Sequence, residues 1–221
     1  MKYTAFVTDE IEDNKFTSSF KELEVDELHT NDVLIKLNWS SLNYKDALSA
    51  KGHKGITRKY PHTPGVDAAG VVVKSNNPNI AEDDKVLVTG HDLGMNTYGG
   101  FSEYVSVPSE WVVKLPEGLS LRESMIYGTA GMTAAICINE LFKHEITPDK
   151  GKILVTGATG GVGSMSVAIL NKIGFKVIAS TGKVDKTNFL KSIGASEVIH
   201  RNEVYDTTGK PLLSRRWSGA I

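Results

Sequence analysis

Apolar and polar residues alternate through roughly the first half of the chain, as they do in β-strands with one buried face. Polar segments rich in Gly, Pro or Asn separate the alternating stretches. The predicted strands cover residues 3–8, 20–25, 32–39, 66–74, 85–89 and 103–107, and a short helix is predicted over 44–50. Strands at this spacing indicate a small, partly open β-barrel.

After residue 119 the apolar residues recur at helical spacing. Ser120 and Glu123 stand three residues apart, the signature of a capping box, and predict a helix that runs to about Tyr127. The small residues 128–131 are expected to interrupt it, and a longer apolar helix is predicted over 132–142.

A strand, a Gly-rich turn, a helix and a second strand follow within about 30 residues, the size of one mononucleotide-binding unit. The first strand is the apolar run Ile153–Val155, and the helix ends at Gly174. The turn contains Gly157, Gly160, Gly161 and Gly163, and the second strand covers residues 176–180.

The pattern after this unit predicts a further helix over 185–193, capped by Gly194, and a third strand over 197–200. Residues 217–221 have the character of the approach to a fourth strand. Because a dinucleotide-binding sheet has two mononucleotide halves, we expect about 100 further residues beyond Ile221. The predicted domains are 1–120, the barrel, and 121–221, an incomplete nucleotide-binding domain.

The Gly-rich turn is suited to a pyrophosphate. Glycines allow the backbone to approach the phosphates, and the first N–H groups and the dipole of the helix face the negative charge. We expect the hydroxyl and backbone N–H groups of one short stretch to bind there: Thr159, Gly160, Gly161 and Val162.

The end of the second strand selects the cofactor. A site for NAD places an acidic residue there, on the ribose 2′-hydroxyl. This chain instead has Ser180, Thr181, Gly182 and Lys183, with no carboxylate before Asp185. Small hydroxyls and a cation suit a 2′-phosphate, so NADPH is favoured over NADH, with Thr181, Gly182 and Lys183 as its ligands. The alternative is that Lys183 begins a solvated helix.

Composition narrows the function classes. The chain is 40% hydrophobic and 23% charged with a formal net charge of −1, so no basic surface indicates nucleic-acid binding. No run of 18 apolar residues predicts a membrane helix. The single cysteine, Cys137, cannot form an internal disulfide and suits a reducing cytoplasm. It lies in a predicted apolar helix, which favours a buried structural thiol over a nucleophile.

Five motifs, in order along the whole chain, resemble the medium-chain dehydrogenase/reductase superfamily. They lie at residues 39–46 (WSSLNYKD), 64–70 (PGVDAAG), 99–104 (GGFSEY), 127–134 (YGTAGMTA) and 155–163 (VTGATGGVG). The match is to the zinc-independent quinone-oxidoreductase-like branch, of the YhdH/YhfP type, which includes NADPH-dependent acryloyl-CoA reductases. The resemblance implies an α/β protein: an N-terminal GroES-like, partly open β-barrel and a Rossmann doubly wound parallel sheet, of which only the first half is present.

Departures from the zinc alcohol dehydrogenases bear on the mechanism. Those enzymes carry a metal-binding Cys near the position of Ser41 and a Gly-His-Glu motif where this chain has Gly65-Val-Asp67. The chain has one cysteine, and no two of its six histidines stand at a ligand-like spacing. The sequence therefore predicts no metal site.

Without a metal, the expected reaction is hydride delivery from NADPH to an electron-poor C=C conjugated with a carbonyl. In the resembling family the stretch that contains Asn43 and Tyr44 lies beside the nicotinamide. We assign Tyr44 to cofactor contact and proton relay, Asn43 to polarisation or orientation, and Asp67 to orienting its neighbours. Their structural alternatives are a packed amphipathic ring, a turn residue and a cap at the barrel rim.

Thr129 resembles the position that approaches the nicotinamide ribose, and it could equally cap the following helix. The Thr156–Gly163 motif also fits the short-chain dehydrogenases. Those enzymes place it near the N-terminus and need a later Tyr-x-x-x-Lys, whereas Tyr205 is followed four residues on by Gly209. That interpretation fails.

Three functions remain open. The first is an NADPH-dependent reductase that acts on acryloyl-CoA-like enoyl thioesters or, as the alternative substrate class, on quinones. The second is a non-catalytic NADPH-binding fragment, and the third a nucleotide-binding scaffold without turnover. The expected partners are a small-molecule substrate and, in the full-length protein, a second copy in a homodimer, but neither nucleic acid nor a membrane.

Overall fold

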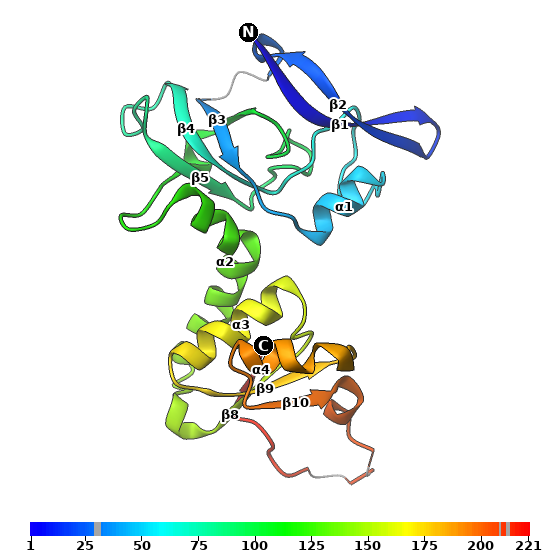
Figure 1. The fold of residues 1–221 in the computed structure, drawn as a ribbon, viewed down its shortest axis with the longest axis vertical. Coiled ribbons are helices and arrows are strands. Elements are labelled where there is room, and N and C mark those ends of the chain that lie inside the picture. Colours follow the sequence, from blue (N-terminus) through cyan, green and yellow to red (C-terminus); the bar gives the residue numbers. More distant parts are fainter. Residues whose placement is uncertain (29–31, 208, 211–212) are drawn as a thin grey trace. The chain divides into compact units, whose positions relative to one another are not determined.

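The computed structural model describes residues 1–28, 32–207, 209–210 and 213–221 (Figure 1). It divides into two compact units, Met1–Thr129 and Ala130–Ile221. The domain boundary expected after residue 120 stands at the start of helix α2, Leu121–Lys143, and the division after Thr129 falls inside that helix.

The first unit combines a β-hairpin with an antiparallel sheet, which confirms the predicted partly open barrel. The hairpin pairs β1 with β2, and the five-stranded sheet has the order β6-β3-β4-β5-β7. Isolated bridges from Ala5 to Ser102 and from Thr8 to His62 tie the hairpin to later segments. The bounds are β1 Lys2–Glu12, β2 Lys15–Glu24, β3 Val33–Trp39, α1 Tyr44–Ala50, β4 Asp67–Ser75, β5 Lys85–Thr89, β6 Tyr104–Val107 and β7 Val113–Lys114.

Alternation places one face of each central strand in the core. Val33 and Ile35 of β3 pack with Val72 of β4 and Val86 and Val88 of β5, all at most 1% exposed. The predicted bounds of β5 and α1 coincide with the observed ones. The hairpin strands are longer than predicted, because Asn14, at φ 57°, closes a tight turn that lets weakly patterned flanking residues pair.

Helix α2 departs from the sequence prediction. The capping box is confirmed: the Ser120 N–H donates to Glu123 Oε2 (2.9 Å), and the Glu123 N–H donates to Ser120 Oγ (3.2 Å). The predicted interruption occurs at Gly128, where the helix kinks at φ 49° and ψ −155°, but it does not extend over residues 129–131. The three residues after it are compatible with a helix, so the chain resumes its helical course at once.

The second unit has a parallel sheet of order β10-β9-β8-β11 in its described part, and this confirms the first half of a doubly wound fold. Its elements are β8 Lys152–Val155, α3 Gly161–Lys172, β9 Lys176–Thr181, α4 Thr187–Ser192, β10 Glu197–His200 and β11 Gly219–Ala220. Short 3₁₀ turns occur at Val25–Glu27, Ser109–Trp111, Pro148–Lys150, Val184–Lys186 and Arg201–Val204. The predicted helix over 185–193 is therefore a 3₁₀ turn followed by the shorter α4.

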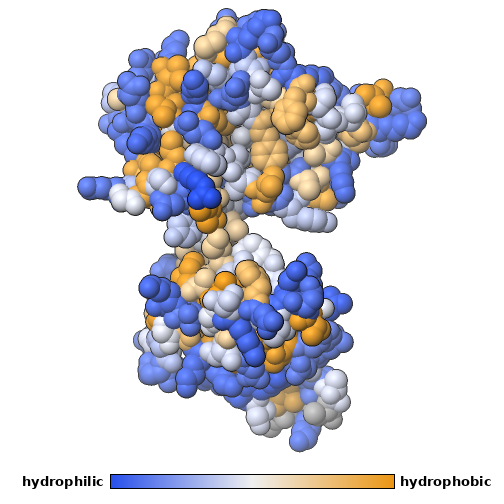
Figure 2. Space-filling view, in the orientation of Figure 1, coloured by the Kyte–Doolittle hydropathy of each residue, from blue (hydrophilic) through white to orange (hydrophobic). Residues whose placement is uncertain are grey.

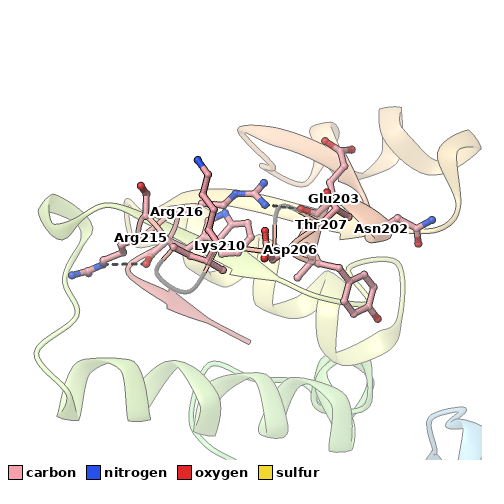
Figure 3. A pocket seen from close by; sticks show the side chains of 12 residues that line it. Asn202, Glu203, Asp206, Thr207, Lys210, Arg215 and Arg216 are labelled. Atoms are coloured by element: carbon pink, nitrogen blue, oxygen red, sulfur yellow. Dashed lines mark hydrogen bonds between the residues drawn. The ribbon is translucent and has the colours of Figure 1, made fainter.

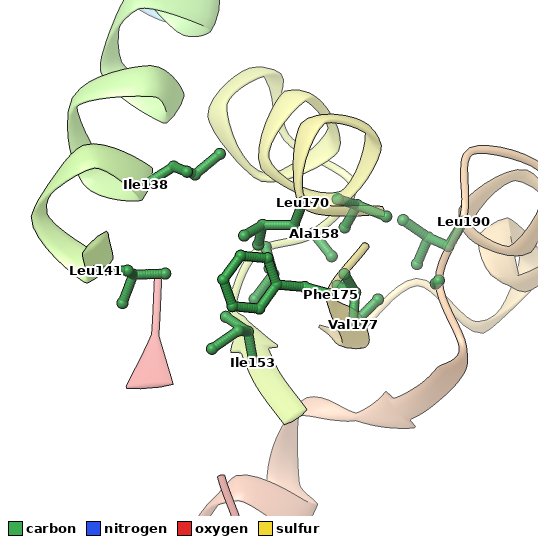
Figure 4. Packing of buried hydrophobic residues seen from close by; sticks show 12 residues of the cluster. Ile138, Leu141, Ile153, Ala158, Leu170, Phe175, Val177 and Leu190 are labelled. Carbon is green, nitrogen blue, oxygen red and sulfur yellow. The ribbon is translucent and has the colours of Figure 1, made fainter. Parts of the chain in front are cut away.

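An apolar core forms on one face of this sheet, where Ile153, Val177, Leu170 and Leu190 meet around Phe175 (Figure 4). Side chains alternate across the sheet, so every second residue of β8 and β9 points toward this core. Cys137, predicted as a buried structural thiol, is only half-buried, whereas Ala134 and Ile138 on the same helix are at most 4% exposed. None of the helices in the described ranges is long and apolar enough to cross a bilayer.

His62 is a buried base in the first unit. Its side chain is 2% exposed, and its Nε2 has no hydrogen-bond partner within the described ranges. Burial lowers the pKa of His62 below 6.5, and the Gly94 backbone and the charge of Asp92 offset this in part. The unfolded chain therefore takes up the proton first, and stability falls as the pH drops below about 6.5.

We expect the unfolding free energy of the wild-type protein to fall between about pH 7.5 and pH 5.5, by at most about 1.4 kcal/mol per pH unit from this group. His62→Leu removes the group and should flatten the curve in urea titrations. Burial raises the pKa of Asp46, so this group makes the unfolding free energy rise as the pH falls. That contribution is the same in both proteins and cancels in the comparison. Parallel pH curves for the two proteins would contradict the prediction.

Candidate functional site

A buried carboxylate organises the polar cluster of the first unit. The side chain of Asp67, fully buried at the start of β4, accepts hydrogen bonds from two separate segments of the chain, residues 41–43 and Thr129. Asn43 Nδ2 donates to Oδ2 at 2.8 Å, and the Ser41 hydroxyl donates to the same oxygen. Thr129 donates twice to Oδ1, from its backbone N–H at 3.0 Å and its hydroxyl at 2.8 Å. Both carboxylate oxygens are thus occupied by donors.

A second buried acid holds the segment that carries Asn43. Asp46, in the first turn of α1, accepts the Asn43 N–H at 2.7 Å and the Val66 N–H at 3.0 Å. Burial raises the pKa of Asp46, and the nearby charge of Asp67 adds to this effect. The hydrogen bonds of Asp46 fix the start of α1 against the residue that precedes β4, so that Asn43 can reach Asp67.

Gly128 makes room for this cluster. A Cβ at this position would lie 2.7 Å from Asp67 Oδ2 and 2.8 Å from Ser41 Oγ, and the backbone has the positive φ that disfavours other residues. The kink in α2 therefore lies next to the Asp67 carboxylate, and it places Thr129 within hydrogen-bond distance of that group.

Gly128→Ala should lower the unfolding free energy by about 1–3 kcal/mol through backbone strain, with crowding of Asp67 in addition. Gly118→Ala is the matched control, because Gly118 also has a positive φ (82°) but has no atom within 4 Å of the added Cβ. Urea unfolding of both variants isolates the crowding. Equal losses would mean that Asp67 does not constrain residue 128.

Of the residues predicted for this site, three lie together in the cluster around Asp67 and one, Tyr44, lies exposed at the surface. Asn43, Asp67 and Thr129 are brought together, and the Nδ2 of Asn43 is used in orienting the carboxylate. Tyr44 begins α1 with 80% of its surface exposed, so its ring is not packed into the first unit. Ser41 was not predicted as a site residue, although the Ser-Ser pair of its motif was the available signal.

The Gly-rich turn of the second unit has the geometry of an anion site. Helix α3 begins at Gly161 and its N-cap, Gly160, has no side chain, so no cap occupies the first N–H groups of the helix. A Cβ on Gly163 would lie 2.4 Å from the Gly157 carbonyl oxygen, which shows how closely the helix start packs on the turn. The Thr159 and Thr181 hydroxyls lie 3.4 Å apart and connect the turn with the end of β9.

A cavity of about 350 Å³ adjoins this turn and the end of β9. Its lining residues are Thr159, Lys183, Lys186 and Phe189, so it combines a hydroxyl, two cations and an aromatic ring that is 45% exposed. The Lys183 N–H donates to Thr181 Oγ1 at 3.0 Å, which fixes the backbone at the cavity edge. Lys186 and Phe189 were missed by sequence reasoning, although both follow Lys183 at the spacing of a helix face.

A larger hollow of about 1020 Å³ lies along the connection from β10 to β11 (Figure 3). Its arginines are used within the connection: Arg216 donates to the Glu203 carbonyl at 2.6 Å, and Arg215 Nε donates to the Trp217 carbonyl at 3.1 Å. The Arg216 guanidinium also lies over the Trp217 ring, 4.3 Å from its centroid. We interpret these contacts as structural.

Within the described ranges, no group of three or more His, Cys, Asp or Glu side chains is placed to hold a metal ion. Asp67 faces hydroxyl, amide and backbone donors. Figure 2 shows polar and apolar side chains mixed over the visible face of both units.

Comparison with known proteins identifies the family. Residues 29–117 match the alcohol dehydrogenase GroES-like domain. The chain is 50% identical over 201 residues to YhfP of Bacillus subtilis, which covers 91% of this chain and 61% of that protein. It is 40% identical over 220 residues to the acrylyl-CoA reductase AcuI of Ruegeria pomeroyi, which covers 99% of this chain and 67% of the relative.

Two crystal structures agree with the fold. The YhdH oxidoreductase of Salmonella enterica, in complex with NADP, has a TM-score of 0.93 and 42% identity, and covers 98% of this chain and 66% of that one. Bacillus subtilis YhfP with NAD bound has a TM-score of 0.95 and 46% identity, and covers 100% of this chain and 67% of that one.

The chain therefore belongs to the quinone-oxidoreductase-like family of the medium-chain dehydrogenase/reductase superfamily, and this confirms the resemblance drawn from its motifs. Within that family its similarity is to the YhfP, YhdH and acrylyl-CoA reductase proteins. It spans about three-fifths to two-thirds of the length of these relatives.

Proposed function

We propose that this protein is a metal-free, NADPH-dependent oxidoreductase that reduces a C=C bond conjugated with a carbonyl, with acryloyl-CoA-like enoyl thioesters as its substrates. The observation that carries the proposal is the Gly-rich turn and cationic cavity of the second unit, in a chain whose GroES-like unit contains the donor-bound Asp67 cluster. Its support includes a relative named acrylyl-CoA reductase and a similar structure in complex with NADP.

The residues of the second unit fit the cofactor. The uncapped helix start suits a pyrophosphate, and the closely packed glycines leave room for its approach. The stretch Thr159–Val162 would hold the diphosphate, and Thr181, Gly182 and Lys183 would hold the 2′-phosphate. NADPH would supply the hydride.

In the first unit, Asp67 would act as an orienting group. Because the hydroxyls of Ser41 and Thr129 both donate to it, their remaining lone pairs point away from the carboxylate as acceptors of fixed direction. Thr129 is proposed to contact the nicotinamide ribose. Tyr44, whose ring is exposed, is proposed to contact the cofactor and to relay a proton to the α-carbon of the substrate as the enolate collapses.

A quinone is the second candidate substrate. It is favoured by the similarity to the quinone oxidoreductase of Sus scrofa, 30% identical over 177 residues. A non-catalytic NADPH-binding role is the candidate of another class, favoured by the uncapped helix start and the cationic cavity of the second unit, which would bind the cofactor without any turnover.

The test is NADPH oxidation, followed at its absorbance maximum near 340 nm, by the purified protein with acryloyl-CoA and, separately, with 1,4-benzoquinone. We expect turnover with acryloyl-CoA and a much lower rate with the quinone. Fast turnover of the quinone without turnover of acryloyl-CoA would show that the protein is a quinone reductase instead. Thermal stabilisation by NADPH without any turnover would support the binding-only role, since a ligand stabilises the folded state by mass action.

We also propose a homodimer in the cytoplasm. The single cysteine supports a reducing compartment, and the dimer rests on the family resemblance alone. Sedimentation velocity of the purified protein tests the dimer, and a monomer at micromolar concentration would contradict it.

A further inference from the structure

Helix α1 has only seven residues, too few for a helix to be stable by itself, and its N-cap is Asn43. Contacts with the rest of the first unit must therefore set its direction. Asp46 fixes the N-terminal end through its bonds to two backbone N–H groups. At the C-terminal end the β1–β2 hairpin reaches the helix, where the Ser18 hydroxyl of β2 donates to the Ala50 carbonyl at 3.2 Å (Figure 1).

The ring of Phe16, also on β2, fills the space directly after the helix. Gly52 follows α1 at φ 77°, and a Cβ there would lie 1.9 Å from Phe16 Cδ2 and 2.1 Å from its Cε2. The same ring packs on Tyr60 with 4.7 Å between the centroids, and the Tyr60 hydroxyl donates to the Ser49 carbonyl at 2.9 Å. Phe16 thus contacts the helix end at residue 52 and again through Tyr60.

Lys54 joins the two rings to the other strand of the hairpin. Its Nζ lies 5.1 Å from the centroid of Phe16 and 5.2 Å from that of Tyr60. The ammonium also pairs at 2.7 Å with Glu10 of β1, the residue opposite Phe16 in the hairpin. Phe16 is therefore the hairpin residue that contacts the helix end, Tyr60 and Lys54 together.

We propose that Phe16 is a positioning residue, which acts through α1 to place Asn43 at the opposite end of the helix. This inference rests on the proposed function, in which Asn43 orients the Asp67 carboxylate by donating to it at 2.8 Å. A helix of two turns moves as a rod, so loss of the ring at one end lets it tilt and displaces the N-cap. A shift of about 1 Å can lower turnover about 100-fold, and because Asp46 still holds the N-terminal end, we expect a loss of about three- to tenfold.

The variant Phe16→Ala tests the proposal in the purified protein, at a temperature well below its unfolding transition. The kcat of NADPH-dependent acryloyl-CoA reduction should fall about three- to tenfold, and KM should change less than about twofold. In an Asn43→Ala background the same exchange should lower kcat less than about twofold, because the group that Phe16 positions is gone. Phe16→Tyr keeps the ring and should keep the wild-type kcat. Phe16→Leu, a smaller truncation, provides the same test if the alanine variant does not fold.

Phe20→Ala is the matched control, since Phe20 lies on the same strand but packs on Phe6, with 5.6 Å between the centroids. It should leave kcat unchanged. Proton–nitrogen correlation NMR gives a readout independent of turnover: the side-chain amide signals of Asn43 should shift in Phe16→Ala and not in Phe20→Ala. Unshifted Asn43 signals in Phe16→Ala, or equal kcat losses with and without Asn43, would overturn the inference. A wild-type protein without turnover, whose Asn43 signals still depend on Phe16, would overturn the proposed function alone.

Discussion

Replacing Asp67 with alanine is expected to lower the unfolding free energy by about 2–4 kcal/mol and to abolish turnover. The reason is that four donors from Ser41, Asn43 and Thr129 converge on this buried carboxylate, and its removal deprives these half-buried groups of their shared acceptor. Each unsatisfied buried group costs about 1–3 kcal/mol, partly recovered by relaxation and by water. Urea unfolding measures the first effect, and NADPH oxidation measures the second.

Two further variants make the result specific. Asp67→Asn keeps the size and one acceptor oxygen but places an NH₂ group against donors, so it should be intermediate in both measurements. Asp84→Ala removes an acid that pairs with Lys114 at the surface, and it should cost less than about 1 kcal/mol. If Asp67→Ala unfolds at the wild-type urea concentration, the cluster does not stabilise the first unit in the way described.

Local patterns were sufficient for most elements of the fold. The strand Glu197–His200 and the helix Tyr44–Ala50 have the predicted bounds, because each is short, strongly patterned and closed by a turn. The Gly-rich turn predicted the strand, turn and helix around it. Its last glycine, Gly163, lies where the start of α3 packs closely on the turn, and a Cβ there would clash.

The sites depended on contacts that no local pattern contains. Thr129 lies 62 residues from Asp67 in sequence, so its two hydrogen bonds to the carboxylate follow from the course of α2 past β4. Tyr44 was chosen by family resemblance, and its place at the exposed first turn of α1 leaves its role a prediction.

Gly163→Ala is expected to have the largest effect on the second unit. The added Cβ would lie 2.4 Å from the Gly157 carbonyl oxygen and 2.7 Å from Ala158 Cα, and neither backbone atom can rotate away. The turn and helix α3 must therefore move apart, which should cost about 1–3 kcal/mol of stability. The same movement displaces the N–H groups of the helix start, so NADPH affinity, measured by fluorescence titration, should fall about tenfold or more.

Gly174→Ala separates the two effects. Gly174 follows the other end of α3 at φ 95°, so alanine there strains the backbone without a close contact, the nearest atom being 3.9 Å away. Both variants should lose stability, but only Gly163→Ala should lose NADPH affinity. Because the two changes lie at opposite ends of one helix, equal NADPH affinities in the two variants would mean that the helix start does not bind the pyrophosphate.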